Sequence, residues 1–161
     1  MDSRTLKQFG FKEWLKISKD KDKNRELILK LPRKKGVYVI RANRCIPRLK
    51  GESDIIYIGE GTIQYRVQQL LEKFLPVNFR SDYKHTASEE IERILNETDL
   101  KLEVSYVTID IEKHVAKILE SIFPSFFRFN EKELAKELER ILLKLYCSDH
   151  IELPPLNRRK G

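Results

Sequence analysis

The chain has 161 residues, of which 40% are hydrophobic, and this composition predicts one globular domain rather than a disordered segment. The 32 Lys and Arg outnumber the 25 Asp and Glu, and the net charge of +7 favours a polyanionic partner such as nucleic acid. No apolar run reaches the ~20 residues of a membrane-spanning helix and the first residues lack the apolar stretch of a signal peptide, so we expect a cytoplasmic protein without membrane contact.

The first part of the chain is expected to form a helix and then a hairpin. A helical period of apolar residues predicts a short amphipathic helix over 11–19, which a solvated charged segment follows. Residues 1–31 are therefore assigned to an N-terminal helical extension. Apolar and β-branched runs then predict two antiparallel strands, over about 36–42 and 54–59, which a basic loop over 43–53 joins.

The second part of the chain alternates helices with one strand. Thr62 is the expected N-cap of the first of these helices. Residues 101–109 alternate apolar and polar side chains, which predicts a third strand. The other expected elements are a loop over 77–86, helices over 87–97, about 112–123 and 131–147, and an extended tail. We therefore predict an α+β fold, an α/β sandwich in which helices flank a small three-stranded antiparallel sheet.

Two tyrosines lie in the predicted hairpin. Alternation along the first strand puts Tyr38 on the same face as Ile40. Alternation along the second puts Tyr57 on the same face as Ile55 and Gly59, so the two phenol rings can lie side by side. One interpretation is a cross-strand aromatic pair in the core. The other is a pair of hydroxyl groups beside a phosphate.

Arg66 lies in the helix that follows the second strand, next to the apolar stripe of that helix. The start of a helix carries a partial positive charge, and together with a guanidinium group it suits a phosphate. The alternative is a surface arginine whose aliphatic stem packs along the helix.

Glu139 is a carboxylate among apolar neighbours in the predicted helix over 131–147. The neighbours at helical spacing are Ala135, Leu142, Leu143 and Tyr146. A carboxylate in such surroundings costs free energy unless a metal ion or an arginine pairs with it. One carboxylate together with a substrate phosphate is a typical way of holding Mg²⁺. The alternative is a glutamate at the rim of the core whose head reaches water.

Together these motifs resemble those of the GIY-YIG nuclease family. The segment GVY, which ends at Tyr38, stands for the GIY element, and the segment YIG, which begins at Tyr57, matches the second element literally. Arg66 follows Tyr57 by nine residues, where the helix arginine of the family is expected. The order of the expected strands and helices also agrees with the family.

The C-terminal part of the resemblance rests on two segments. ELERILLKLY resembles the glutamate helix of the family and assigns Glu139, and LPPLN resembles its terminal asparagine and assigns Asn157. The resemblance covers about 32–157 and implies a GIY-YIG-like nuclease domain over 32–161.

The chain departs from the family pattern at three places. The two tyrosines are 19 residues apart, which is longer than the common link. Glu60 follows the YIG segment where many members have a lysine, a serine or another polar residue. A second Ala-x-x-Leu-Glu motif places Glu120, with Asn130 behind it, directly after the third strand. We prefer Glu139 as the metal ligand because LPPLN and Tyr146 accompany it.

The resemblance implies a DNA endonuclease that hydrolyses phosphodiester bonds with Mg²⁺ (or Mn²⁺), in restriction, repair or a mobile element. Glu139 would hold the cation against the scissile phosphate. Tyr38 would accept the proton of the attacking water, and Tyr57 would position water or phosphate. Arg66 would stabilise charge on the phosphoryl oxygens, and Asn157 would brace the site.

The implied partner is DNA, and a homodimer is one way to cut both of its strands. Basic segments over 33–35, 44–50 and 158–160 could hold the DNA backbone without reading its sequence. The alternatives are a non-catalytic nucleic-acid-binding module that retains the fold, and an interaction protein whose tyrosines and glutamate are structural. Three scattered histidines are expected in loops or on the surface, without a catalytic role: His85, His114 and His150.

Overall fold

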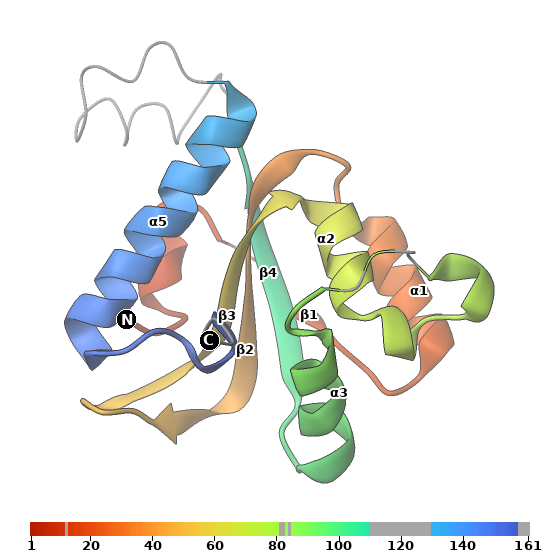
Figure 1. Ribbon diagram of the computed structural model, residues 1–161, viewed down its shortest axis with the longest axis horizontal. Helices are drawn as coiled ribbons and strands as arrows, with labels where there is room; N and C mark the ends of the chain where they lie inside the picture. Colours follow the sequence, from red (N-terminus) through yellow and green to blue (C-terminus); the bar gives the residue numbers. More distant parts are fainter. Residues whose placement is uncertain (12, 81–82, 84, 110–129, 158–161) are drawn as a thin grey trace.

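The centre of the fold is an antiparallel sheet of four strands in the order β1-β4-β2-β3, with helices packed on both of its faces (Figure 1). The computed structural model describes residues 1–11, 13–80, 83, 85–109 and 130–157. The strands are β1 (Leu15–Lys16), β2 (Lys35–Pro47), β3 (Glu52–Thr62) and β4 (Leu102–Thr108). The α-helices of the described residues are α1 (Lys21–Lys30), α2 (Ile63–Leu70), α3 (Ser88–Glu97) and α5 (Glu131–His150). Short 3-10 helices span Thr5–Phe9, Glu72–Phe74, Val77–Phe79 and Pro155–Asn157.

The predicted α+β class is confirmed, but the predicted number of strands is wrong. The additional strand, β1, pairs through Leu15 and Lys16 with the edge of β4 that β2 leaves open. A strand of two residues shows no alternation of side chains, and its partner lies far along the chain. The pairing is therefore a tertiary contact that no local pattern announces.

The predicted helix over 11–19 is wrong, because residues 13–19 are not helical. The Ile17 N–H instead donates to the Leu102 carbonyl at 2.9 Å, in line with β1. The helix comes in the charged segment that follows, where Asp20 caps α1 by accepting from the main-chain N–H groups of Asp22 and Lys23. Residues 1–31 bury side chains in the core on both faces of the sheet: Leu6, Phe11, Ile17, Leu27, Ile28 and Leu31.

The predicted basic loop over 43–53 is also wrong, because β2 and β3 continue through it as a long hairpin. The turn is short, and the Arg48 N–H donates to the Gly51 carbonyl at 3.0 Å. A β-bulge interrupts the pairing, since Ile40 opposes Tyr57 whereas the next residue, Arg41, opposes Ile55. The bulge sends Ile55 to the face opposite Tyr57, so the expected Tyr57–Ile55 face is corrected.

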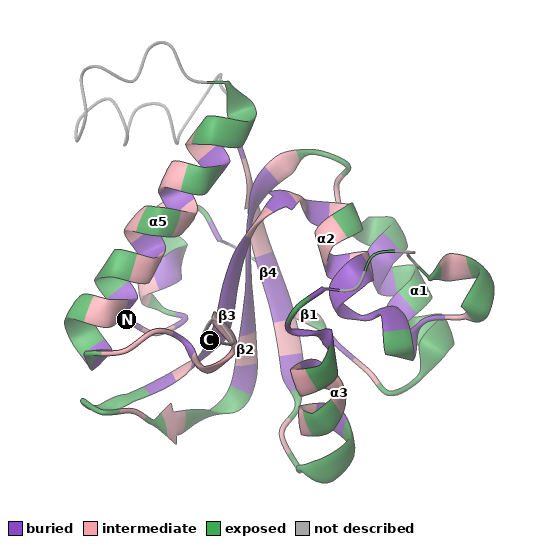
Figure 2. Ribbon diagram, viewed as in Figure 1, coloured by how far each residue is buried: buried purple, intermediate pink, exposed green. Residues whose placement is uncertain are grey.

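Each face of the sheet buries its own core, and Figure 2 shows the buried residues of the helices turned toward the strands. Helices α1, α2 and α3 cover the face that carries Tyr38 and Tyr57. Helix α5 and the 3-10 helix Thr5–Phe9 cover the other face, which carries Val37, Val39 and Ile58. The two functional candidates of the hairpin thus lie on the face opposite the helix that carries Glu139.

Most of the remaining described elements follow the predictions, but the expected loop over 77–86 and the expected extended tail each contain a 3-10 helix, Val77–Phe79 and Pro155–Asn157. The expected third strand forms as β4, and the expected helices at 87–97 and 131–147 form as α3 and α5. The predicted helix over 112–123 lies outside the described residues. Within the described part of the chain, no helix combines the length and the apolar character needed to cross a membrane.

Candidate functional site

The two tyrosine rings lie next to each other on the same face of the hairpin. Tyr38 of β2 opposes Gly59 of β3, two residues beyond Tyr57, and the ring centroids are 5.8 Å apart. A Cβ at Gly59 would lie 2.7 Å from the Tyr38 hydroxyl oxygen and 2.6 Å from Tyr57 Cε1, so the rings occupy the space that a side chain would take. Tyr38 is 0% and Tyr57 is 8% exposed.

His85 joins the two tyrosines, although it was expected in a loop without a role. Its Nε2 lies 3.0 Å from the hydroxyl oxygen of Tyr38 and 3.3 Å from that of Tyr57. The ring of His85 is 3% exposed and meets the ring of Tyr57 edge-on at 5.4 Å. His85 does lie in a loop, as expected, but it is buried there rather than on the surface. A single histidine in an irregular segment has no periodicity, so only the tertiary contact reveals it.

Arg66 approaches the same nitrogen from α2. Its Nη2 lies 3.4 Å from His85 Nε2, and its Nη1 donates to Gln69 Oε1 at 3.0 Å. A Cβ at Gly61 would lie 2.7 Å from Arg66 Cγ, and Gly61 has a φ of +135°, so a glycine lets the arginine stem cross the chain there. Three of the predicted site residues, Tyr38, Tyr57 and Arg66, thus meet at one atom.

The start of α2, which was expected to suit a phosphate, has two of its main-chain N–H groups already bonded. Thr62 occupies the N-cap position but its side chain makes no capping hydrogen bond. The Ile63 N–H donates to the Lys34 carbonyl at 3.0 Å, and the Gln64 N–H donates to the Pro32 carbonyl at 3.1 Å. These two donors are already satisfied, so the guanidinium of Arg66, rather than the helix terminus, supplies the positive charge of the site.

Glu139 lies half-buried on α5, between buried residues of that helix and the charges of the site. Burial raises the pKa of its carboxyl to about 7, and the charge of Glu60 acts in the same direction. The positive charges of Arg66 and Lys136 act against this rise. The charge of Glu139 in turn raises the pKa of both Tyr38 and Tyr57.

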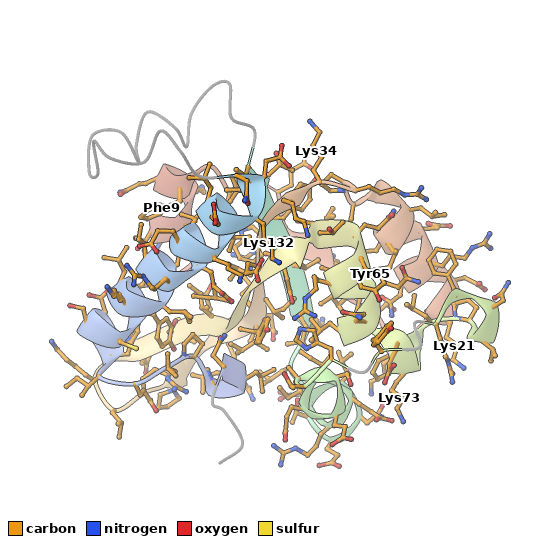
Figure 3. The ribbon with its side chains drawn as sticks, turned by 45° about the horizontal axis from the view of Figure 1, so that its top comes forward. Phe9, Lys21, Lys34, Tyr65, Lys73 and Lys132 are labelled. Atoms are coloured by element: carbon orange, nitrogen blue, oxygen red, sulfur yellow. The ribbon has the colours of Figure 1, made fainter. Side chains whose placement is uncertain are left out.

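Glu139 therefore lies within electrostatic range of the tyrosine pair, even though α5 packs on the opposite face of the sheet. Figure 3 shows how this happens, because α5, marked by Lys132, lies on one side of the end of β3 and α2, marked by Tyr65, lies on the other. Strand β3 is at the edge of the sheet, so side chains from both layers can meet beyond it.

Asn157 is bound to the strand that carries Tyr57. Its Oδ1 accepts from the Ile58 N–H at 2.9 Å, and its Nδ2 donates to the Ile58 carbonyl at 2.6 Å. These bonds occupy the outer edge of β3 between Tyr57 and Gly59. Asn157 therefore holds the backbone of β3 next to Tyr57.

The protonation of the site is dominated by burial. Burial raises the pKa of Tyr38 well above its usual 10.0 and also raises the pKa of Tyr57, whereas the charge of Arg66 lowers both. Burial and then Arg66 lower the pKa of His85 to about 4. At neutral pH the site therefore holds neutral phenols and a neutral imidazole beside a guanidinium cation.

Of the predicted site residues, Glu139 supplies the carboxylate that could be a ligand of a hard cation. Carboxylate oxygen is the ligand type that Mg²⁺ prefers, and a nearby cation would favour the ionised form of a carboxyl whose pKa burial has raised. Among the residues that the structure describes, no cluster of three or more His, Cys, Asp or Glu could hold a metal ion by protein ligands alone.

The other candidate residues of the sequence analysis have different surroundings. The competing Glu120 lies outside the described residues, and its companion Asn130 is the N-cap of α5, within a capping box with Glu133. Arg48, from the basic segment over 44–50, forms an ion pair with Glu152 at 2.8 Å with both side chains almost covered. Arg44 pairs with an exposed carboxylate, that of Asp99.

Of the other two histidines, the structure describes His150 but not His114. His150 is 5% exposed, so its expected surface position is also wrong. It binds the main-chain carbonyls of Met1 and Lys50, which is a structural role. His114 and the basic segment 158–160 lie outside the described residues.

Comparison of the chain with protein-family models, with curated proteins and with solved structures gave no match.

Proposed function

We propose that the chain is a magnesium-dependent DNA endonuclease that hydrolyses phosphodiester bonds with a site of the GIY-YIG type. One observation carries the proposal. Tyr38, Tyr57 and Arg66 belong to short motifs on three different elements, and all three lie within 3.4 Å of one nitrogen, His85 Nε2. A chance likeness of motifs does not require such a convergence.

Two further residues of the motif set support the same proposal. Asn157 is hydrogen-bonded to Ile58, the residue between Tyr57 and Gly59. Glu139 acts on both tyrosines through its charge. The GIY-YIG-like domain over 32–161 and its fold are part of this proposal, and they rest on the residue set and on the order of the elements.

Each residue has a part that its surroundings allow. The guanidinium of Arg66 would bind the phosphoryl oxygens and stabilise the charge that grows on them. The tyrosine pair would accept the proton of the attacking water. Glu139 would hold Mg²⁺ (or Mn²⁺), which when bound supplies positive charge to the phosphate and lowers the pKa of bound water. Asn157 would keep β3 in place.

The alternative function is a non-catalytic nucleic-acid-binding module that retains the fold. It is favoured by the full burial of Tyr38, whose hydroxyl oxygen is held by His85. The net charge of +7 suits either function. The two functions differ in whether the phosphodiester bond is cut.

The test is the nicking of supercoiled plasmid DNA by the purified chain, with Mg²⁺ and with EDTA. We expect nicking that needs Mg²⁺ and that falls by at least about a hundredfold in Glu139→Gln and Arg66→Ala, as for the loss of an electrostatic group at a reacting phosphate. Matched controls are Glu137→Gln on the same helix and Arg93→Ala on α3, whose partners Arg140 and Glu90 lie on the surface.

The outcome that favours the alternative is binding to DNA without cutting. Cutting that survives both site substitutions would contradict the assignment of the residues. Linear product formed at the first turnover, together with a dimer in sedimentation, would indicate that two copies cut both strands.

A further inference from the structure

We propose that His85 is a positioning residue of this site, whose Nε2–H donates a hydrogen bond to the hydroxyl oxygens of Tyr38 and Tyr57 and so favours the loss of a proton from the pair. The meaning of this role for catalysis rests on the proposed function. The hydrogen bond itself does not, and it can be measured without any substrate.

The tautomer of His85 follows from its other ring nitrogen. The Ala87 main-chain N–H donates to His85 Nδ1 at 3.1 Å in a buried setting. A backbone N–H can only donate, so Nδ1 must carry its lone pair there. A neutral imidazole carries one proton, which then lies on Nε2, the nitrogen that faces the tyrosines.

The opposite tautomer does not fit the same contacts. It would put a proton on Nδ1 and turn two donors, the imidazole N–H and the Ala87 N–H, against each other at 3.1 Å. This excludes the simple alternative in which a bare Nε2 takes the proton of a tyrosine as a general base. His85 therefore acts as a donor to the phenol oxygens, not as an acceptor.

The imidazole stays neutral because of what faces it. Arg66 Nη2 lies 3.4 Å from Nε2, and two donors at this distance do not form a hydrogen bond. Instead, the guanidinium charge opposes a second positive charge on the ring. His85 is also 3% exposed, so an imidazolium there would lose its hydration.

The hydrogen bond from Nε2–H stabilises the ionised form of the tyrosine pair more than its neutral form. A hydrogen bond from Nε2–H to a phenolate is charge-assisted and stronger than one to a neutral hydroxyl. The Arg66 guanidinium stabilises the same negative charge, while Glu139 and Glu60 oppose it from α5 and β3. The tyrosines face one donor and each other, so they titrate as a coupled pair rather than as separate groups.

In the proposed reaction the proton balance is simple. The pair releases one proton to solvent before the reaction and takes one back from the attacking water. The resulting hydroxide bonds to phosphorus, and the bond from phosphorus to the leaving oxygen breaks. The leaving oxygen keeps the bonding electron pair and takes a proton from solvent, which balances the proton that the pair released. His85 keeps its own proton throughout, since it holds the charge of the phenolate without exchanging the proton.

The first experiment is nitrogen-15 NMR of the imidazole rings in the full chain without nucleic acid or metal. Signals of His85 are assigned by their loss in His85→Gln. We expect a proton on Nε2 and none on Nδ1 at pH 7, with no change of protonation down to about pH 5. A proton on Nδ1, or an imidazolium at pH 7, would overturn the proposal. The readout itself is made on the parent chain, and His85→Gln serves only to assign the signals.

The second experiment titrates the tyrosines by carbon-13 NMR at Cζ, with Tyr38 and Tyr57 assigned by single Phe substitutions. His85→Gln keeps an N–H donor near the position of Nε2, whereas His85→Leu removes it. The proton of interest is the first one that the neutral pair loses. We expect the pair to hold this proton at least about tenfold more tightly in the Leu variant than in the Gln variant, as for loss of a hydrogen bond to a charged group.

His150→Gln, a substitution at the other buried histidine, should leave the pair unchanged. Equal titration in the Gln and Leu variants would contradict the proposal. The pH profile of nicking adds a readout, because the alkaline rise should move to higher pH in His85→Leu and return in His85→Gln. If the chain does not nick DNA while Nε2 carries the proton, only the proposed function fails.

Discussion

The side-chain amide of Asn157 binds both main-chain atoms of Ile58, since Oδ1 accepts from the N–H at 2.9 Å and Nδ2 donates to the carbonyl at 2.6 Å. An edge strand leaves such groups without a strand partner, and β3 is the edge of this sheet. A side chain near the C-terminal end of the chain thus completes the strand that carries Tyr57 and Gly59. Docking of the 3-10 helix Pro155–Asn157 therefore supports the strand on which the site is built.

The first prediction concerns this clamp. Asn157→Asp keeps the acceptor for the Ile58 N–H but places a carboxylate oxygen against the Ile58 carbonyl. We expect a loss of about 1–3 kcal/mol in the free energy of unfolding, measured with urea, and a lower rate of nicking. Asn96→Asp, on an exposed part of α3, is the control and should change neither. An Asn157→Asp variant as stable as the parent chain would refute the role of the clamp.

The second prediction tests the glycine of the YIG segment. Gly59→Ala would push a methyl group to 2.7 Å from the Tyr38 hydroxyl oxygen and 2.6 Å from Tyr57 Cε1, so the rings must shift from their present positions. We expect a loss of about 1–3 kcal/mol in stability and the loss of plasmid nicking.

The matched control for this change is Gly51→Asn, in the hairpin turn. No atom lies within 4 Å of a Cβ at Gly51, and asparagine tolerates its φ of +67°. This variant should retain both stability and nicking. Full activity in Gly59→Ala would show that the close approach of the rings is not required.

The third prediction is a loss of stability in acid that His85 causes. The unfolded chain binds a proton at this histidine near pH 6.5, whereas the folded chain does so only near pH 4, because burial and Arg66 lower the pKa. The stability of the folded state should therefore fall by about 3 kcal/mol as the pH falls from 6.5 to 4. Urea unfolding at pH 7, 5.5 and 4.5 measures this slope. In His85→Gln the free energy of unfolding should fall less over this pH range, by about 3 kcal/mol. An equal fall in both chains would contradict the burial of a neutral imidazole.

The fourth prediction concerns Glu139 without metal. The unfolded carboxyl ionises near pH 4.5, while burial and Glu60 raise its pKa in the folded chain to about 7. Stability that is present below pH 4.5 is therefore lost as the pH rises toward 7, by about 1–2 kcal/mol after solvent screening. In EDTA at pH 8, Glu139→Gln should unfold at a higher temperature than the parent chain.

Added Mg²⁺ should reverse this order, since a cation that binds only the folded chain through Glu139 stabilises the parent and not the variant. Thermal unfolding at pH 8 with EDTA or with Mg²⁺ measures both effects. Glu137→Gln is the control on the same helix. If Mg²⁺ does not change the unfolding temperature of the parent chain, the cation needs the substrate phosphate to bind.

Many parts of the site could be predicted from the sequence because they follow from local periodicity. The alternation around Tyr38 and Tyr57 put both rings on faces of a hairpin, and the structure places them together. The apolar neighbours of Glu139 at helical spacing indicated a carboxylate turned toward the core, and it is half-buried with a raised pKa. The hairpin register was less predictable, since the bulge at Ile56 inverts the side of Ile55.

The periodic signals failed where a contact between distant segments decided the structure. The helix expected over 11–19 gives way to β1 because the edge of β4 offers hydrogen bonds to the main chain at Leu15 and Ile17. The loop expected over 43–53 became strand because the two arms of the hairpin pair with each other beyond the sheet. A local pattern carries no information about such partners.

Alone, the sequence determined the α+β class, most of the helices that the structure describes and the candidate side chains of the site, because these depend on residue type and on spacing within one element. The tertiary structure decided that Tyr38, Tyr57 and Arg66 meet at His85, a residue whose local sequence says nothing of its place. The physical reason is that a buried polar group is specified by the donors and acceptors around it, and the fold brings these from β2, β3, α2 and the segment before α3.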